Sequence, residues 1–199
     1  MKIVRFSELG RKVVAVGRNY ADHAKELGNA VSTTKPLLFM KPSSSYITAG
    51  QSIEIPLGCS ELHHEIELGA VISKQSKRIQ ESEAMNFIGK FRKPETLKTM
   101  FDTSLPVSEL IPLNRISDPG NINLWCKVNG ELRQNGCTKD MIFSLPFLVS
   151  YISQYFTLEE GDLILTGTPA GVGPVKSGDV ITGGIPDVIE ISFPVIQRT

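Results

Sequence analysis

The sequence predicts a strand-rich α+β domain in which a rolled or sandwiched sheet carries peripheral helices. Short apolar segments typical of strands outnumber the helical ones. The dipeptide Asn129-Gly130, which follows an alternating strand over 124–128, is the strongest short-range signal of a β-hairpin. A chain of 199 residues is long enough for one domain with a hydrophobic core and too short for two comfortable ones, so we expect a single domain over residues 1–199.

The first half of the chain predicts mainly strands, over 12–16, 37–40, 52–55 and 62–73. The last of these is the longest and is rich in Val, Ile and Leu. One short helix is expected over 20–27, with Asn19 as its cap and Gly28-Asn29 as its end.

The second half is expected to contain a short helix over 81–88 and a longer one over 144–156. Ser144 caps the longer helix and Pro146 lies in its first turn. Strands over 162–165 and 189–193 close the fold. Between the helices, the segment 89–106 is charged, contains a proline and shows no clear pattern.

The composition excludes several classes of protein. Hydrophobic residues make up 41% and charged residues 21%, and 21 basic residues balance 21 acidic ones. A neutral chain has no basic field to attract nucleic acid or an anionic membrane, so neither partner is expected. The cysteines, Cys59, Cys126 and Cys137, are odd in number and form no CxxC pair, so we interpret them as structural residues of a reducing compartment.

The run His63-His64-Glu65-Ile66-Glu67-Leu68 is the first candidate site. On a strand, alternate side chains share a face, so Glu65 and Glu67 would lie together on one side. Two adjacent carboxylates repel each other, and a divalent cation with oxygen ligands (Mg²⁺, Mn²⁺ or Ca²⁺) relieves that repulsion. The alternative is a solvated strand face that carries two glutamates without a metal.

His23 and Glu26 form the second candidate site. They lie three residues apart on the short helix, hence on one face, where a carboxylate can orient an imidazole that activates water. The alternative is an incidental surface ion pair.

The third candidate is the segment 165–173, in which small and hydroxyl-bearing residues follow a strand. Its backbone N–H groups and Thr168 could hold an anion such as a carboxylate. It lacks the lysine of a Walker loop, and the chain has no Gly-x-Ser-x-Gly motif of an α/β-hydrolase. The alternative is a plain turn.

In this order and spacing, the three motifs resemble the fumarylacetoacetate hydrolase family. The matching stretches are 14–26, 39–43, 63–69, 127–134, 141–144, 157–162 and 166–173. The resemblance implies a mixed β-sandwich roll and a homodimer. It also implies that Glu65 and Glu67 bind Mg²⁺ or Mn²⁺, and that His23 and Glu26 form a water- or proton-handling dyad on a mobile lid helix.

By the same resemblance, Thr168 helps to hold the substrate carboxylate, and Arg18, Tyr20 and Lys41 contact the substrate. The implied substrate is a small α-keto acid. The implied activity is metal-dependent hydrolysis of acylpyruvates, with decarboxylation or tautomerisation of oxaloacetate, in the mitochondrion or the cytoplasm.

The chain departs from the family pattern near 89–98. A block that in the family supplies a third metal carboxylate and substrate-contacting residues is absent after 85–89. In the segment that follows, Thr99 stands where the family has a catalytic lysine, and Lys98 precedes it by one residue. Asp102 or Glu95 is a possible substitute for the third carboxylate.

A second hypothesis follows from this departure. A catalytically impaired paralogue or splice product would at most bind a small acid or dimerise. A third possibility is that the chain lacks residues that its native form contains.

Overall fold

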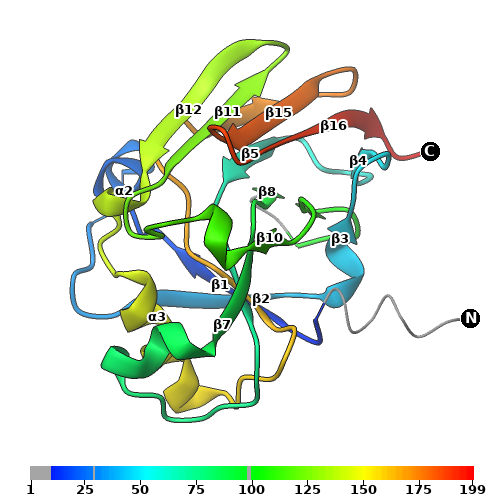
Figure 1. Cartoon of the computed structure of the whole chain (residues 1–199). Coiled ribbons are helices and arrows are strands. Elements are labelled where there is room, and N and C mark those ends of the chain that lie inside the picture. Colours follow the sequence, from blue (N-terminus) through cyan, green and yellow to red (C-terminus); the bar gives the residue numbers. More distant parts are fainter. Residues whose placement is uncertain (1–9, 29, 98–99) are drawn as a thin grey trace, which may run out of the picture.

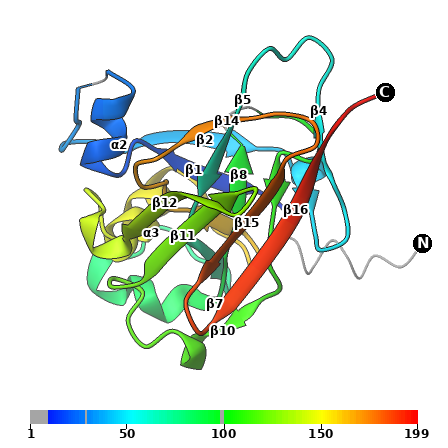
Figure 2. The ribbon, with the colours of Figure 1, turned by 90° about the horizontal axis from the view of Figure 1, so that it is seen from above.

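The computed structural model describes residues 10–28, 30–97 and 100–199 and is built mainly from strands in mixed sheets (Figures 1 and 2). The largest sheet has the order β10 (Ile111–Pro112), β7 (Ile88–Arg92), β6 (Gly69–Ile72), β13 (Leu163–Leu165), β1 (Val13–Gly17) and β2 (Leu37–Lys41). A second has the order β12 (Glu131–Cys137), β11 (Asn123–Val128), β15 (Val180–Ile185), β16 (Ile189–Gln197) and β4 (Ile53–Ile55). This arrangement confirms the predicted fold class.

Two smaller sheets complete the strand structure. One has the order β14 (Gly173–Val175), β5 (Leu62–Ile66) and β8 (Glu95–Leu97), and the other pairs β3 (Tyr46–Ile47) with β9 (Leu105–Pro106). Most neighbours are antiparallel, whereas β1–β13, β4–β16 and β3–β9 are parallel.

Strand β1 is buried on both faces. Its alternate residues enter different clusters: Val14 and Val16 join the main hydrophobic core, while Val13 and Ala15 join a smaller cluster with Leu105. A strand covered on both sides needs apolar residues at every position, which explains its unbroken apolar run.

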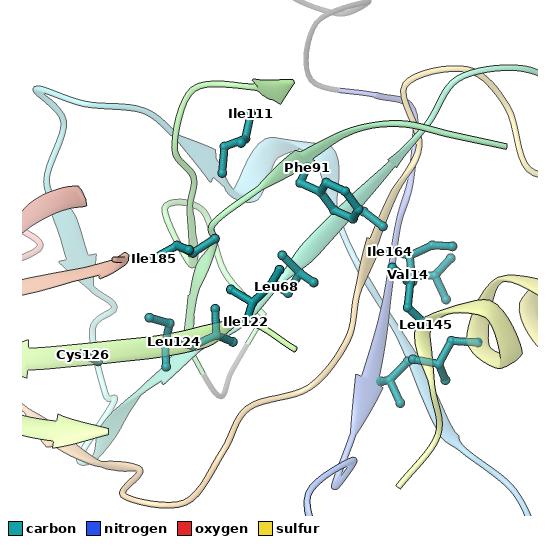
Figure 3. Close-up of a cluster of buried hydrophobic side chains, with 14 of the residues drawn as sticks. Val14, Leu68, Phe91, Ile111, Ile122, Leu124, Cys126, Leu145, Ile164 and Ile185 are labelled. Atoms are coloured by element: carbon teal, nitrogen blue, oxygen red, sulfur yellow. The ribbon is translucent and has the colours of Figure 1, made fainter. Parts of the chain in front are cut away.

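Figure 3 shows how the main core joins the sheets. Leu68, which directly precedes β6, and Phe91 of β7 lie in one cluster with Leu124 and Ile185 from the five-stranded sheet. Packing between the inner faces of two sheets is the arrangement of a sandwich, which agrees with the expected fold.

Two α-helices of the described part of the chain lie at the edge of the sheets (Figure 1). Helix α3 (Leu145–Tyr155) begins where predicted, and the Ser144 hydroxyl accepts a hydrogen bond from Phe147 N. Helix α2 (Ala21–Glu26) is capped differently, because Tyr20 is its first flanking residue and the Asn19 side chain bonds elsewhere. The predicted helix over 81–88 is a 3₁₀ helix, Glu81–Phe87. Among the described residues, no helix is long and apolar enough to cross a membrane.

The prediction of one long strand over 62–73 was wrong. The chain bends after Ile66, so that β5 and β6 belong to different sheets. At the bend, Glu67 N donates to Pro94 O instead of continuing either strand ladder. Hydrophobicity alone could not reveal this bend, because both strands bury apolar residues.

The segment 89–106, which shows no clear pattern in the sequence, contains β7, β8 and β9. These strands pair with partners elsewhere in the chain, since β7 lies beside β6 and β8 lies beside β5. Their conformation therefore depends on tertiary pairing more than on local sequence.

Candidate functional site

Glu65 and Glu67 lie at the end of β5, where the chain leaves the three-stranded sheet. Glu65 is half-buried and pairs in register with Thr96 of β8, and Glu67 is 3% exposed. The Thr96 hydroxyl hydrogen-bonds Glu67 Oε1 and lies 3.0 Å from the main-chain carbonyl oxygen of Glu65. Gly167 N donates to the other oxygen of Glu67. The charges of both carboxylates act on Lys41, so both lie near one polar region.

Burial raises the pKa of Glu67 from 4.5 to about 7, while the hydrogen bonds from Thr96 and Gly167 N and the nearby Lys41 oppose that rise. The surroundings also accommodate the neutral carboxyl group. Protonated Oε1 can donate to the Thr96 hydroxyl, which in turn donates to the Glu65 carbonyl oxygen. Near neutral pH, Glu67 can therefore hold or release a proton.

Lys41, at the end of β2, brings an ammonium group close to these carboxylates. Its side chain is buried, and Nζ donates to Leu97 O at 2.9 Å and to Ser104 O at 3.2 Å. Burial lowers the pKa of Lys41 to about 8, although the charges of Glu67 and Glu65 favour the protonated form. Lys41 and Glu67 thus have pKa values close to each other and to neutrality, which is typical of groups that move protons.

The dyad predicted on the short helix is present in the structure as a close pair. His23 Nδ1 lies 3.8 Å from Glu26 Oε2, with His23 buried and Glu26 exposed. Both Glu26 oxygens accept from Gly171 N at 3.1 Å, which attaches α2 to the loop before β14.

Asn19 fixes the base of α2. Its side-chain amide donates to Phe143 O and Thr166 O and accepts from Phe143 N, all at 2.8–3.0 Å. Gly167 next to Thr166 has φ +93°, and a Cβ there would lie 2.8 Å from Asn19 Cβ, so only glycine allows this approach. In the sequence, Asn19 indicated only a helix cap.

Gln134 is a site residue to which the sequence assigned no role. It is fully buried on β12, where Oε1 accepts from Ile66 N at 3.0 Å and Nε2 donates to Thr168 Oγ1 and Pro169 O at 2.8 Å. It therefore connects the glutamate-bearing strand to the loop that carries Thr168. No local signal indicates it, because β12 lacks the alternation of apolar and polar residues that marks an inward position.

Arg18 and Tyr20 flank Asn19 but lie differently. Arg18 is exposed and has φ 58°. Tyr20 is 3% exposed, and its hydroxyl has no hydrogen-bond partner among the described residues. Burial, and secondly the charge of Glu67, raises the pKa of Tyr20, so the hydroxyl stays protonated and is available as a donor. A hollow of about 220 Å³ adjoins it, between α2 and the loop at 169–170.

The structure gives no support to Glu95 or Asp102 as a substitute carboxylate. Glu95 pairs in register with Ile66, so its side chain lies on the opposite face of β5 from Glu65. There Glu95 Oε2 meets Lys93 Nζ at 3.0 Å, with both side chains fully buried. Asp102 is exposed in a turn. Lys98 and Thr99 lie outside the described residues.

The whole arrangement matches known proteins in sequence and in structure. The family described as fumarylacetoacetate (FAA) hydrolase C-terminal matches residues 12–196. The chain belongs to the fumarylacetoacetate hydrolase family. Oxaloacetate tautomerase FAHD1, mitochondrial, of Arabidopsis thaliana is 48% identical, over 98% of this chain and 96% of that protein. Oxaloacetate decarboxylase, mitochondrial, of Dictyostelium discoideum is 46% identical, over 98% of both chains.

Solved structures agree with this assignment. Fumarylpyruvate hydrolase from Pseudomonas aeruginosa, in complex with Mn²⁺ and pyruvate, superposes with a TM-score of 0.88 at 32% identity, covering 94% of this chain and 90% of that one. The alignment with the Arabidopsis relative spans 214 positions, more than the 199 residues of this chain, so the relative contains residues that this chain lacks. That the absent residues lie near 89–98 stays a prediction from the sequence.

Proposed function

We propose that this protein is a metal-dependent enzyme of small α-keto acids, which tautomerises or decarboxylates oxaloacetate and hydrolyses acylpyruvates. The activities and the mitochondrial location by which the relatives are named, and the Mn²⁺–pyruvate complex of the solved neighbour, support this proposal. We further propose a mitochondrial location and a homodimer.

One observation carries the proposal: Glu65 and Glu67 share a polar region with Lys41 and adjoin the loop that holds the lid helix. Both carboxylates contribute to the electrostatic environment of Lys41. Gly167, whose N–H donates to Glu67, lies four residues before Gly171, whose N–H donates to Glu26. Glu67 and Glu26 thus accept hydrogen bonds from the same short loop, which supports a role for both in one site.

The donor set fits Mg²⁺ or Mn²⁺. Glu65, Glu67 and Thr96 offer oxygen atoms to this region, and hard cations prefer oxygen ligands. Mg²⁺ is commonly held by one or two carboxylates together with water and substrate, so two glutamates are sufficient. When bound there, such an ion would act as a Lewis acid toward the keto and carboxylate oxygens of the substrate.

The chain's own residues would orient the substrate and move protons. Thr168 Oγ1, held by Gln134, would help to orient the substrate carboxylate, and the protonated Tyr20 hydroxyl would donate a hydrogen bond. His23, oriented by Glu26, would take a proton from water or from the carbon next to the keto group. Lys41 Nζ would return a proton, since its pKa lies near 8.

The test is turnover of oxaloacetate and acetylpyruvate by the purified protein with Mg²⁺ or Mn²⁺, and with EDTA. We expect metal-dependent turnover that His23→Ala reduces by at least about a hundredfold, the usual contribution of a general base. Glu65→Gln should reduce it as well, because the change removes the charge of a proposed metal ligand. Glu61→Gln, an exposed change on the same segment, is the matched control and should leave activity unchanged. Activity in EDTA, or full activity of either site variant, would contradict the proposal.

A second candidate function is binding of a small acid without turnover. The specific observation in its favour is that the residue beside Glu65 and Glu67 on β8 is Thr96. Its neutral hydroxyl adds no third carboxylate to hold a metal. Binding of pyruvate or oxalate by the folded protein, in the absence of turnover under every metal condition, would favour this candidate.

A further inference from the structure

A second polar cluster lies on the face of β5 opposite to Glu65. It consists of His64 on β5, Glu95 on β8 and Cys126 on β11, each at most 1% exposed. Three strands that are distant in sequence therefore each contribute one metal-binding side chain to the same buried point. Figure 3 shows Cys126 at the edge of the hydrophobic core, next to Leu124.

The two distances from the sulfur in this cluster match those between the ligands of a tetrahedral zinc ion. Cys126 Sγ lies 3.7 Å from His64 Nδ1 and 3.6 Å from Glu95 Oε1, and one ligand atom from each residue falls within 4.8 Å of the others. Zinc bond lengths of about 2.3 Å to sulfur and about 2.0 Å to nitrogen or oxygen place tetrahedral ligands about 3.5 Å apart.

We propose that His64, Glu95 and Cys126 form a second metal site, for a borderline-soft divalent ion such as Zn²⁺. Imidazole nitrogen and thiolate sulfur favour Zn²⁺ over Mg²⁺, whereas the oxygen-only face with Glu65 and Glu67 favours Mg²⁺ or Mn²⁺. The two faces of one strand thus select different ions. A metal at the second site would fasten β5 to β8 and β11.

Lys93 is the group with which the metal competes. Its Nζ lies 3.0 Å from Glu95 Oε2, and both side chains are fully buried. In the metal-free protein this ammonium balances the Glu95 charge. A divalent ion would replace that balance, and Cys126 would release its thiol proton to solvent as the sulfur binds.

The ring of His64 must also adjust. Gln134 Oε1 accepts from Ile66 N, and Gln134 Nε2 donates to Pro169 O, so the amide presents its oxygen to His64 Nδ1 at 3.1 Å. His64 Nδ1 therefore carries the proton in the metal-free protein. Coordination through Nδ1 moves that proton to Nε2, and coordination through Nε2 leaves the bond to Gln134 in place.

The experiment is a titration of the full chain with Co²⁺, a spectroscopic substitute for Zn²⁺, in the presence of excess Mg²⁺ to fill the oxygen-lined site. We expect one equivalent of Co²⁺ to produce the near-ultraviolet absorption of a cobalt–thiolate bond. Cys126→Ser should remove this absorption. Cys137→Ser, which changes another buried cysteine, should retain it, and so should Glu65→Gln.

Lys93→Met tests the competition directly. Removal of the ammonium should tighten Co²⁺ binding about tenfold or more, because a nearby like charge no longer opposes the ion. Circular dichroism confirms that each variant is folded. X-ray absorption of the Zn²⁺-loaded wild-type protein needs no variant, and should show one sulfur among nitrogen and oxygen ligands.

Several results would overturn the proposal. These are a folded wild-type protein without cobalt–thiolate absorption, equal absorption in Cys126→Ser, unchanged or weaker binding in Lys93→Met, or a zinc spectrum without sulfur. None of these readouts depends on catalysis, so they are independent of the proposed enzymatic function.

Discussion

Glu67 shows how a single residue can be both costly and useful. Its carboxyl group is almost completely removed from water, yet Thr96, Gly167 N and Lys41 offer it hydrogen bonds or charge. Burial outweighs these interactions, so the folded protein binds a proton at Glu67 more tightly than the unfolded chain does. At the residue scale, the site therefore works against stability near neutral pH.

The stability of the metal-free protein should reflect this raised pKa. Between the ordinary pKa of 4.5 and about 7, the folded state holds a proton that the unfolded state has lost. The contribution of Glu67 to the free energy of unfolding is therefore fully present below pH 4.5. It falls by roughly 3 kcal/mol in total as the pH rises to 7.

Urea unfolding of the wild type and of Glu67→Gln, in EDTA from pH 5 to 8, measures this effect. The glutamine amide can donate to the Thr96 hydroxyl, so we expect the variant to gain stability relative to the wild type as the pH rises. The comparison cancels the other titrating groups. A difference that stays constant with pH would show that burial does not raise the pKa of Glu67.

Thr96 determines how much negative charge the candidate metal site holds. Thr96→Asp places a third carboxylate beside Glu65 and Glu67, and we expect it to tighten Mn²⁺ binding about tenfold or more. Thr96→Asn has the same shape without the charge and is the control. Isothermal titration with Mn²⁺ measures both, and equal affinities would place the ion away from Thr96.

At the scale of elements, β5 separates two polar regions. Alternate side chains place Glu65 on one face and His64 on the other, and β8 follows the same alternation with Thr96 and Glu95. Gln134 then fixes β5 to the loop that carries Thr168. The spacing between the glutamates and that loop therefore depends on one buried amide.

Replacement of Gln134 should disturb this connection. Gln134→Leu keeps a similar volume but leaves Ile66 N and Pro169 O without partners, which we expect to cost about 3 kcal/mol of unfolding free energy. Gln154→Leu, on the exposed surface of α3, is the control and should change stability little. Denaturant unfolding measures both. Equal stability of the two variants would mean that water replaces the lost bonds.

At the scale of the whole molecule, the sheets pack around one main core and leave several apolar side chains exposed. Leu37 on β2 is 52% exposed, and β2 is the edge strand of the largest sheet. Exposed apolar residues on an edge strand favour pairing with another chain. They agree with the proposed homodimer without identifying its interface.

Multi-angle light scattering tests the homodimer. We expect a species of twice the 21.8 kDa chain mass at micromolar concentration, and a monomer only at high dilution. A monomer at all concentrations would show that the resemblance to the family does not extend to its assembly.

Local patterns predicted many elements correctly. The hairpin at Asn129-Gly130 is confirmed, with both residues at positive φ, and so are the start of α3 at its Ser144 cap and the strand at β1. Each of these depends on interactions within a few residues, which a single sequence contains.

By itself, the sequence determined the fold class and the pairing of His23 with Glu26, because turns and short spacings are local properties. Its motifs also indicated the family, through their resemblance to known members. Only the tertiary structure decided where β5 ends, that Glu95 lies opposite to Glu65, and that Gln134 joins two distant segments. These features depend on which strands lie side by side. Strand pairing brings together residues far apart in the chain, and no local pattern specifies it.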